Sequence, residues 1–206
     1  MMSEFIYQSP NSLPSSLCDE IIELFENTQN KYDGCTLKGV LKHIKDTTDF
    51  IIPKNDATWH HIEKYLYSEL STNLLEYMDT INKKEEYNLK NNDNIIFKIF
   101  DNTIQHIDSF MVQKYEKGKG KYIYHNDFCM DIDKKRYRTI TYLWYLNTVD
   151  EGGETEFCGD YKIKPEKGKL ILFPASWCYP HRGKMPISDN KYILTGWFYM
   201  LSDPNS

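Results

Sequence analysis

The spacing of apolar residues changes about half-way along this chain, from a helical period to a period of two. The first helical segment carries four apolar residues at positions i, i+4, i+7 and i+8, namely Leu17, Ile21, Leu24 and Phe25. This spacing predicts an amphipathic helix that ends near Asn30. Ser15 or Ser16 is its expected N-cap, because a serine hydroxyl can accept a hydrogen bond from a free backbone N–H of the first turn.

A second, longer segment of helical spacing runs from about Thr58 to the region of Asn82. Its apolar residues are Trp59, Ile62, Leu66, Leu70, Leu74, Tyr77 and Met78. Asp56 stands where an N-cap is expected. The polar stretch 83–94 follows as a connection, so both predicted helices lie in the N-terminal half of the chain.

Beyond residue 94 the apolar residues are mostly β-branched or aromatic, and they alternate with polar ones. The predicted strands are 95–100, 109–115, 122–127, 138–146, 154–158, 169–173 and 191–200. Many short strands separated by Gly, Asp, Asn and Pro turns predict an antiparallel sandwich or barrel. We therefore expect a mainly β, α+β fold in which the N-terminal helices cover one face of the sheets.

A chain of 206 residues is long enough for one domain with a sizeable core. We expect a single domain over residues 1–206, in which residues 1–94 form a mainly helical support and residues 95–200 form the β core. The chain shows no internal repeat and no segment of low complexity.

The net charge and the cysteine content limit the binding partners and the cellular compartment that we expect for this chain. The net charge is −5, which argues against nucleic acid or an anionic membrane as a general partner. The five cysteines are scattered and never form a C-x-x-C motif, which favours a reducing compartment. No stretch approaches the ~20 apolar residues of a membrane span, and the N-terminus does not resemble a signal peptide. We expect a soluble, cytoplasmic protein with no obligate partner.

His125 and Asp127 form an H-x-D motif within a predicted strand, and His181 follows at a distance. Alternate strand residues share a face, so both side chains of the motif can reach one ion. Two imidazoles and one carboxylate are the facial triad of non-haem Fe(II) centres, which leaves three coordination positions open. A chance motif with a surface histidine is the alternative interpretation. Lys191, ten residues beyond His181, and the paired glycines 152–153 favour the metal site.

Seven segments occur in the order found in one enzyme family: Gln113–Tyr115, Tyr122–Asp127, Tyr145–Asn147, Gly152–Phe157, Pro165–Gly168, His181–Gly183 and Lys191–Trp197. With them, residues 95–200 resemble the catalytic core of the 2-oxoglutarate- and Fe(II)-dependent dioxygenases, and most of all the prolyl 4-hydroxylase branch. The N-terminal helices and the Lys45–Asp49 segment resemble those of small stand-alone members.

The resemblance implies a double-stranded β-helix, or distorted jelly roll, with iron held by His125, Asp127 and His181 at its open mouth. 2-Oxoglutarate would chelate this iron, and Lys191 would bind its far carboxylate. The implied reaction consumes O2, converts 2-oxoglutarate to succinate and CO2, and hydroxylates a substrate C–H bond at the iron centre without a separate general base. Ascorbate is implied as the reductant that rescues oxidised iron.

Five further residues are expected around 2-oxoglutarate: Tyr115, Tyr145, Thr141, Leu143 and Thr155. The two tyrosines match family positions that supply hydroxyl groups. Thr141 and Leu143 share the inward face of the Tyr145 strand by alternation, and Thr155 follows the paired glycines. Ordinary strand packing is the alternative interpretation for each of them.

Four residues are candidates for substrate contacts: Arg138, Arg182, Tyr122 and Trp197. Arg138 is near the start of a strand where relatives place a substrate-contacting arginine, and Arg182 directly follows the distal histidine. The alternatives are solvated arginines and a tryptophan that fills the core. The segment 114–121 is either a mobile loop over the site or, more simply, a charged hairpin turn.

A peptide or protein prolyl residue is the substrate that the resemblance favours. A free amino acid or another small metabolite is the alternative, because one scaffold hosts many substrates. A non-catalytic jelly-roll binding module is a second alternative, although such a module has no need of three metal ligands and a cosubstrate cation. Demethylation of nucleic acid is disfavoured, since that branch carries arginines where this chain has Lys191 and Trp197.

Overall fold

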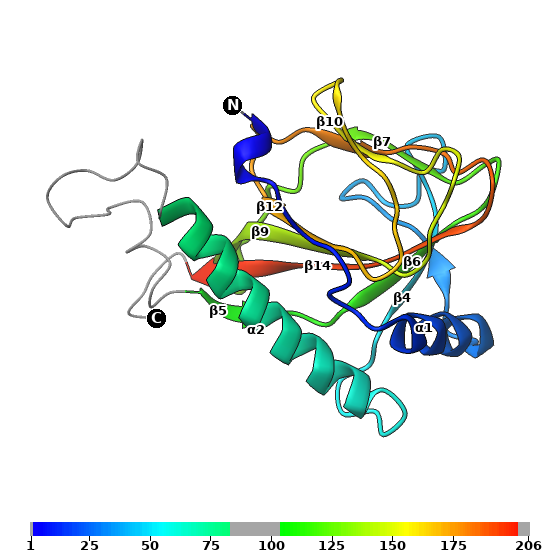
Figure 1. Ribbon diagram of the computed structural model, residues 1–206, viewed down its shortest axis with the longest axis horizontal. Coiled ribbons are helices and arrows are strands. Elements are labelled where there is room, and N and C mark those ends of the chain that lie inside the picture. The colour runs from blue at the N-terminus through cyan, green and yellow to red at the C-terminus, as the bar shows by residue number, and fades with distance from the viewer. Residues whose placement is uncertain (1, 83–103, 202–206) are drawn as a thin grey trace, which may run out of the picture.

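A computed structural model describes residues 2–82 and 104–201 of the chain (Figure 1). Its helices are a 3-10 turn η1 (Met2–Phe5), α1 (Ser15–Asn27) and α2 (His60–Asn82). The described strands form two sheets, and every strand pair in them is antiparallel. The prediction of a mainly β, antiparallel fold is confirmed.

The larger sheet has nine strands within the described residues. Its order is β1 (Tyr7–Ser9), β12 (Leu170–Pro174), β9 (Arg136–Tyr145), β14 (Lys191–Leu201), β6 (Met111–Tyr115), β4 (Thr48–Ile51) and β2 (Tyr32–Asp33), with β5 (Ile104–Ile107) paired to β14 and β8 (Met130–Asp131) paired to β9. The smaller sheet is β11 (Tyr161–Ile163), β10 (Thr155–Phe157), β13 (His181–Gly183), β7 (Lys121–His125) and β3 (Lys45–Asp46).

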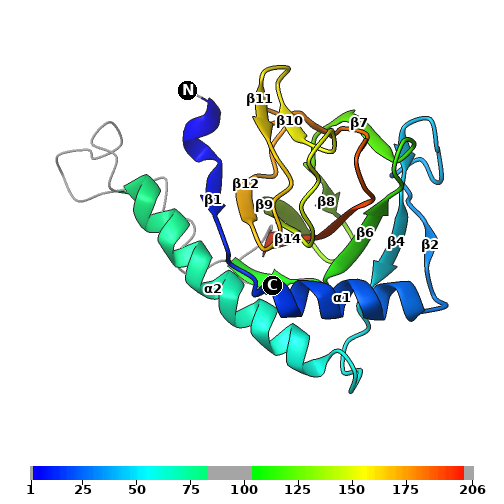
Figure 2. The ribbon, with the colours of Figure 1, turned by 45° about the vertical axis from the view of Figure 1, so that its right-hand side comes forward.

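The larger sheet lies between the helices and the smaller sheet. Figure 2 shows α1 and α2 on one side of β9, β14 and β6, and β7, β10 and β11 on the other. Alternation along β9 explains the layers: Tyr142 and Trp144 join the core cluster under the helices, whereas Leu143 and Tyr145 join the cluster between the sheets. The structure is therefore a jelly-roll core with helices packed on one face, as expected.

Both helices form where apolar spacing predicts them. Ile62, Leu66 and Leu70 of α2 are fully buried against the larger sheet. The expected serine cap of α1 is wrong, because Pro14 occupies the N-cap position and no side chain bonds there. Asp56 accepts a hydrogen bond from the Thr58 backbone N–H (2.8 Å) in the turn before α2. No helix in the described part of the chain is long and apolar enough to cross a bilayer.

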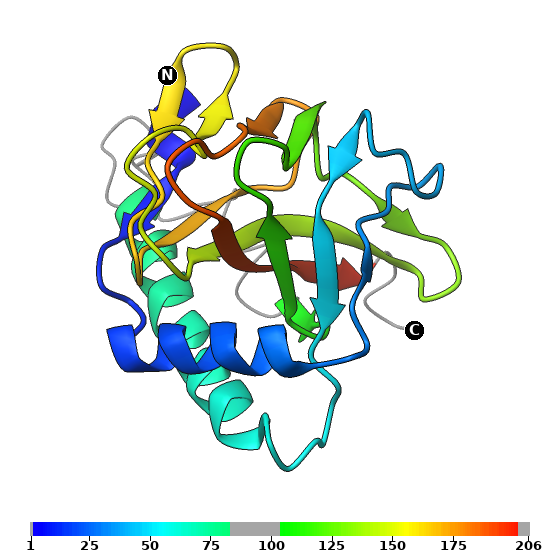
Figure 3. The same ribbon diagram turned by 90° about the vertical axis from the view of Figure 1, so that its right-hand side faces the viewer.

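The N-terminal region contributes more than helices. Four short strands, β1 to β4, enter the two sheets, and β4 lies beside β6 in the register Asp49↔Gln113 (Figure 3). Strands of two to four residues are too short to show a period of two, so the sequence analysis missed them, together with β5, β8, β11 and β13. The predicted strand 95–100 lies outside the described residues.

Truncation of one buried leucine of α2 tests the packing of the helix on the sheet. Leu66→Ala should lower the free energy of unfolding by roughly 2–5 kcal/mol, because it leaves a cavity in a fully buried position. Leu75→Ala on the same helix is the control, since Leu75 is 68% exposed. Urea unfolding followed by circular dichroism measures both, and equal losses would contradict this packing.

Candidate metal centre and its cavity

The two histidines of the predicted triad face each other across adjacent strands of the smaller sheet. His125 ends β7 and pairs in register with His181 on β13, and their ring centroids are 4.3 Å apart. Asp127 lies 3.7 Å from His125 Nε2 and 3.6 Å from His181 Nε2. One ligand atom from each of the three residues lies within 4.8 Å of the others. The three side chains thus converge on one point.

Each imidazole is oriented by its other nitrogen. His125 Nδ1 is 2.8 Å from the Ile123 carbonyl oxygen, and His181 Nδ1 is 3.0 Å from that of Tyr179. These contacts place the proton on Nδ1 and leave Nε2 as a free lone pair toward Asp127. Burial, reinforced by the neighbouring His181, lowers the pKa of His125 to about 4, so the ring is neutral at pH 7. Two imidazoles and a carboxylate are a donor set that fits Fe(II).

Asp127 is not held as the H-x-D spacing predicted. Strand β7 ends at His125, so alternation along a strand does not orient Asp127. The Thr141 hydroxyl of β9 instead donates to Asp127 Oδ2 at 2.7 Å. Burial opposes ionisation of Asp127, but both histidines and the Thr141 hydroxyl outweigh it and hold the carboxyl pKa below its usual value.

The outward face of the smaller sheet carries a buried carboxylate that links the two histidine strands. Glu156 of β10 is 2% exposed, pairs in register with Arg182 of β13 and accepts from its guanidinium at 2.6 Å. The Tyr124 hydroxyl of β7 donates to the same carboxylate oxygen. Tyr124 precedes His125, and Arg182 follows His181. Arg182 is not among the residues that line the cavity, and its contact with a substrate stays a prediction.

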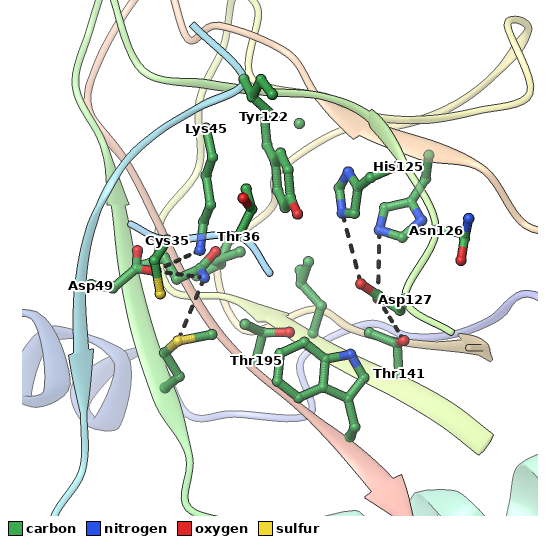
Figure 4. A pocket seen from close by; sticks show the side chains of 18 of the residues that line it. Cys35, Thr36, Lys45, Asp49, Tyr122, His125, Asn126, Asp127, Thr141 and Thr195 are labelled. Atoms are coloured by element: carbon green, nitrogen blue, oxygen red, sulfur yellow. Dashed lines mark hydrogen bonds and ion pairs between the residues drawn. The ribbon is translucent and has the colours of Figure 1, made fainter. Parts of the chain in front are cut away.

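A cavity of about 620 Å³ opens between the sheets beside the triad (Figure 4). Lys191, at the start of β14, is 1% exposed and lines it. Its Nζ donates to the Gly153 carbonyl at 2.9 Å and lies 4.0 Å from the Tyr115 ring centroid. Burial lowers the pKa of Lys191 to about 7, although the Glu154 carboxylate acts in the opposite direction. The cavity thus contains a buried cation that an anionic ligand would stabilise.

Four of the five residues predicted around the cosubstrate line this cavity: Tyr115, Thr141, Leu143 and Thr155. The fifth, Tyr145, is not among the described lining residues. It lies behind the wall, where its hydroxyl donates to Thr155 Oγ1 at 2.7 Å.

Three of the four predicted substrate residues also line the cavity. Tyr122 stacks on His125 with ring centroids 3.5 Å apart and an angle of 14° between the planes. The Arg138 guanidinium lies 3.5 Å from the Trp197 ring centroid. Arg138 Nε and Trp197 Nε1 are buried without a hydrogen-bond partner among the described residues. Both residues thus line the cavity, while these N–H groups themselves are enclosed by the protein.

The cavity extends further than the sequence analysis predicted. Lys45, Asp49 and Gln113 line it, and Lys45 forms a buried ion pair with Asp49. The Lys45–Asp49 segment contributed only to the resemblance, because an ion pair in such short strands gives no periodic signal. The signal that could have revealed it is the presence of two ionic residues four apart directly before the apolar residues of β4.

Segment 114–121 is a closed hairpin turn between β6 and β7. Gly120 N–H donates to the Glu116 carbonyl at 2.7 Å, and Gly118 N–H donates to the Pro186 carbonyl at 2.8 Å. This geometry thus supports the simpler interpretation of the segment, a charged hairpin turn.

A family model described as the 2OG-Fe(II) oxygenase superfamily matches residues 110–199, which include the triad, Lys191 and Tyr115. A curated relative, probable prolyl 4-hydroxylase 10 of Arabidopsis thaliana, is 32% identical. This match covers 46% of the present chain and 43% of the relative, so it spans less than half of that protein. This part of the chain, less than half of its length, is thus similar to the 2OG-Fe(II) oxygenase superfamily.

Solved structures of prolyl hydroxylases share the fold of this chain. A Trichoplax adhaerens prolyl hydroxylase in complex with a hypoxia inducible factor peptide fragment has a TM-score of 0.70 at 22% identity, over 96% of this chain and 84% of that one. A Pseudomonas putida prolyl-4-hydroxylase has a TM-score of 0.62 at 18% identity, over 94% of this chain and 92% of that one. The viral collagen prolyl hydroxylase of Paramecium Bursaria Chlorella virus-1 has a TM-score of 0.58 at 23% identity, over 96% of this chain and 97% of that one.

Glu156→Gln tests whether the outer face of the smaller sheet holds the predicted metal ligands in place. We expect the affinity for Mn(II), a redox-stable substitute for iron, to fall roughly tenfold, because the variant loses the charge that ties Arg182 and Tyr124 together. Spectroscopic titration measures it. Lys162→Met is the control, since the Lys162 ammonium is half exposed and 3.8 Å from Glu156. If Glu156→Gln lowers the free energy of unfolding but leaves the affinity for Mn(II) unchanged, Glu156 stabilises the fold and does not position the metal ligands.

Proposed function

We propose that this chain is an Fe(II)- and 2-oxoglutarate-dependent dioxygenase that hydroxylates a prolyl residue of a peptide or protein, with release of succinate and CO2. The observation that carries the proposal is the meeting of the three metal ligands with the buried cation Lys191 in one cavity. The match of residues 110–199 to the 2OG-Fe(II) oxygenase superfamily supports the proposed cofactor and cosubstrate.

In this proposal His125, Asp127 and His181 hold the iron, and Lys191 binds the distal carboxylate of 2-oxoglutarate. Iron with 2-oxoglutarate and O2 supplies the oxidising power for C–H hydroxylation, and ascorbate is the proposed reductant that maintains the iron. Lysine offers a point charge without the bidentate fork of arginine, so hydroxyl groups must complete its site. Tyr115 and Thr155 line the cavity where such hydroxyls are needed.

The remaining residues orient the substrate and exclude water. Tyr122 covers one face of the His125 ring, which shields that metal ligand from solvent. Leu143 and Phe173 add apolar walls to the cavity. Arg138 and Trp197 line the cavity beside Tyr122, and we expect them to contact the substrate.

Two observations support a peptide as the substrate. The curated relative and the three solved relatives are all named prolyl hydroxylases, and one of them is bound to a peptide. The rim of the cavity exposes Leu37 (90%), Phe128 (51%) and Ile123 (43%), which suits an extended chain lying over the opening. A free amino acid is the second candidate, which the opposite charges of Lys45 and Asp49 inside the cavity favour.

Conversion of 2-oxoglutarate to succinate tests the reaction. Protein loaded with iron without oxygen, then exposed to O2 with ascorbate, should form succinate, and prolyl peptides should gain the mass of one oxygen. His125→Ala and Lys191→Ala should each lose this activity by at least about a hundredfold. Absence of succinate from parent protein with confirmed iron binding and a broad peptide set would overturn the dioxygenase assignment in favour of a binding module.

The affinity for 2-oxoglutarate should depend on pH through Lys191, whose pKa is lowered to about 7 by burial. Below pH 7 the ammonium already exists, so binding takes up no proton. Above pH 7 binding must protonate the amine, so the affinity falls by up to about tenfold per pH unit. Calorimetry of Mn(II)-loaded protein at pH 6 and 8.5, in buffers of different ionisation enthalpy, measures the proton uptake. Lys191→Arg should remove this dependence, and a pH-independent parent would contradict the mechanism.

A further inference from the structure

The cavity has a second compartment beyond the metal centre, at the edge strands of the larger sheet. In Figure 4 the Lys45 and Asp49 side chains lie on one side of the view and His125 and Asp127 on the other, with Tyr122 between them. Residues 32–51 of the N-terminal region supply most of this second wall: Tyr32, Cys35, Thr36, Leu37, Lys38, Ile44, Lys45, Asp49 and Ile51.

The ion pair in this compartment has unequal hydrogen bonding. Asp49, which is 1% exposed, accepts from Lys45 Nζ (2.6 Å), Thr47 Oγ1 (2.7 Å) and Gln113 Nε2 (3.2 Å). The carboxylate is thus well satisfied. An ammonium can donate three hydrogen bonds, but the described hydrogen bonds of Lys45 comprise only the one to Asp49. Lys45, itself 5% exposed, therefore retains donor capacity next to the cavity.

Stability alone does not explain this pair. Burying two charges costs desolvation energy that their attraction often only offsets, and apolar residues of similar volume are commonly as stabilising. The backbone at Gly34 also packs closely against the pair, because a Cβ at that position would lie 2.0 Å from Thr47 Oγ1 and 3.0 Å from Lys45 Cε. The backbone thus lies tightly against a polar group at the cavity wall, as is expected of a binding group held in one position.

Lys45 is within reach of a substrate bound at the metal. Its Nζ lies 5.5 Å from the Tyr122 ring centroid, which lies 3.5 Å from that of His125. The two distances together place the ammonium within about 9 Å of the His125 ring. Because an extended chain advances about 3.3 Å per residue, a group up to about three residues from the reacting one can contact Lys45.

The charge of the cavity favours an anion. Its ionised lining residues, among those the structure describes, are the cations Lys38, Lys45, Arg138 and Lys191 and the anions Asp49 and Asp127. Bound Fe(II) and 2-oxoglutarate carry two opposite charges each and cancel. An excess of two positive charges thus remains, which attracts a negatively charged substrate.

We propose that Lys45, held in place by Asp49, is a subsite for a carboxylate of the substrate. The carboxylate is either an acidic side chain within about three residues of the hydroxylated position or the α-carboxylate of a free amino acid. This inference rests on the proposed hydroxylase function and adds a preference to it. Lys45 is a specificity-determining residue here, since it contacts the substrate away from the reacting carbon.

Paired peptides test the subsite. The probes are capped prolyl heptapeptides with one Asp at each of the three positions before or after Pro, each beside its Asn counterpart, and L-proline beside L-prolinamide. With Asp at one of these positions, the peptide should have a kcat/KM about tenfold higher than its Asn counterpart, mainly because its KM is lower. Alternatively, L-proline should show the same advantage over L-prolinamide. Lys45→Met should reduce this ratio to near one, whereas Lys45→Arg should largely retain it.

Lys42→Met is the matched control, because Lys42 pairs with Asp33 at 2.9 Å nearby, is half exposed and does not line the cavity. It should keep the full preference. Since Lys45→Met leaves Asp49 without its cation, the doubly neutral variant Lys45→Met with Asp49→Asn is measured too, and thermal unfolding shows that each variant folds.

A second readout separates failure of the subsite from failure of the proposed function. Binding of the same fluorescently labelled peptides to Mn(II)- and 2-oxoglutarate-loaded protein is followed by anisotropy. If no probe is hydroxylated but the Asp forms bind more tightly through Lys45, the subsite stands and the prolyl assignment fails. If Asp and Asn forms react and bind equally, or if Lys45→Met keeps the preference, the subsite is overturned.

Discussion

The hydrogen bond from Thr141 to Asp127 joins the two sheets at the metal centre. The smaller sheet carries both histidines, whereas the larger sheet carries Thr141 and Lys191. Neither sheet alone can therefore form the site. The separation of the sheets at their open end fixes the distance between the His–Asp–His group and Lys191, and the core between the sheets maintains that separation. Phe173 and Phe157, which pack edge to face at 4.9 Å, link the sheets directly beside His181.

The meeting of the three predicted metal ligands with Lys191 in one cavity could be predicted from the sequence, whereas the cavity wall formed by residues 32–51 could not. The predicted ligands and Lys191 occur in motifs whose spacing reflects direct chemical requirements, and Thr141 and Leu143 follow from alternation along one long strand. The two helices were also predictable, since α2 keeps its apolar spacing over 23 residues. Long periodic elements give a signal that short ones cannot give.

Residues whose positions depend on contacts between distant segments were not predictable. The ion pair of Arg182 with Glu156 forms across two strands and had no signal in the sequence. Lys45 and Asp49 meet Gln113 only after β3, β4 and β6 have joined two different sheets. The serine cap of α1 failed for a local reason, because proline already fixes the backbone at Pro14 and leaves no side-chain acceptor there.

The contribution of the N-terminal strands to the cavity has an evolutionary consequence. The segment that matches the family model, residues 110–199, contains the three predicted metal ligands and Lys191. The opposite wall, from Tyr32 to Ile51, precedes that segment in the chain. Mutations in the wall can thus accumulate without disturbing the oxidising centre. Such a division allows descendants of one catalytic core to diverge in the molecules they accept while their chemistry stays constant.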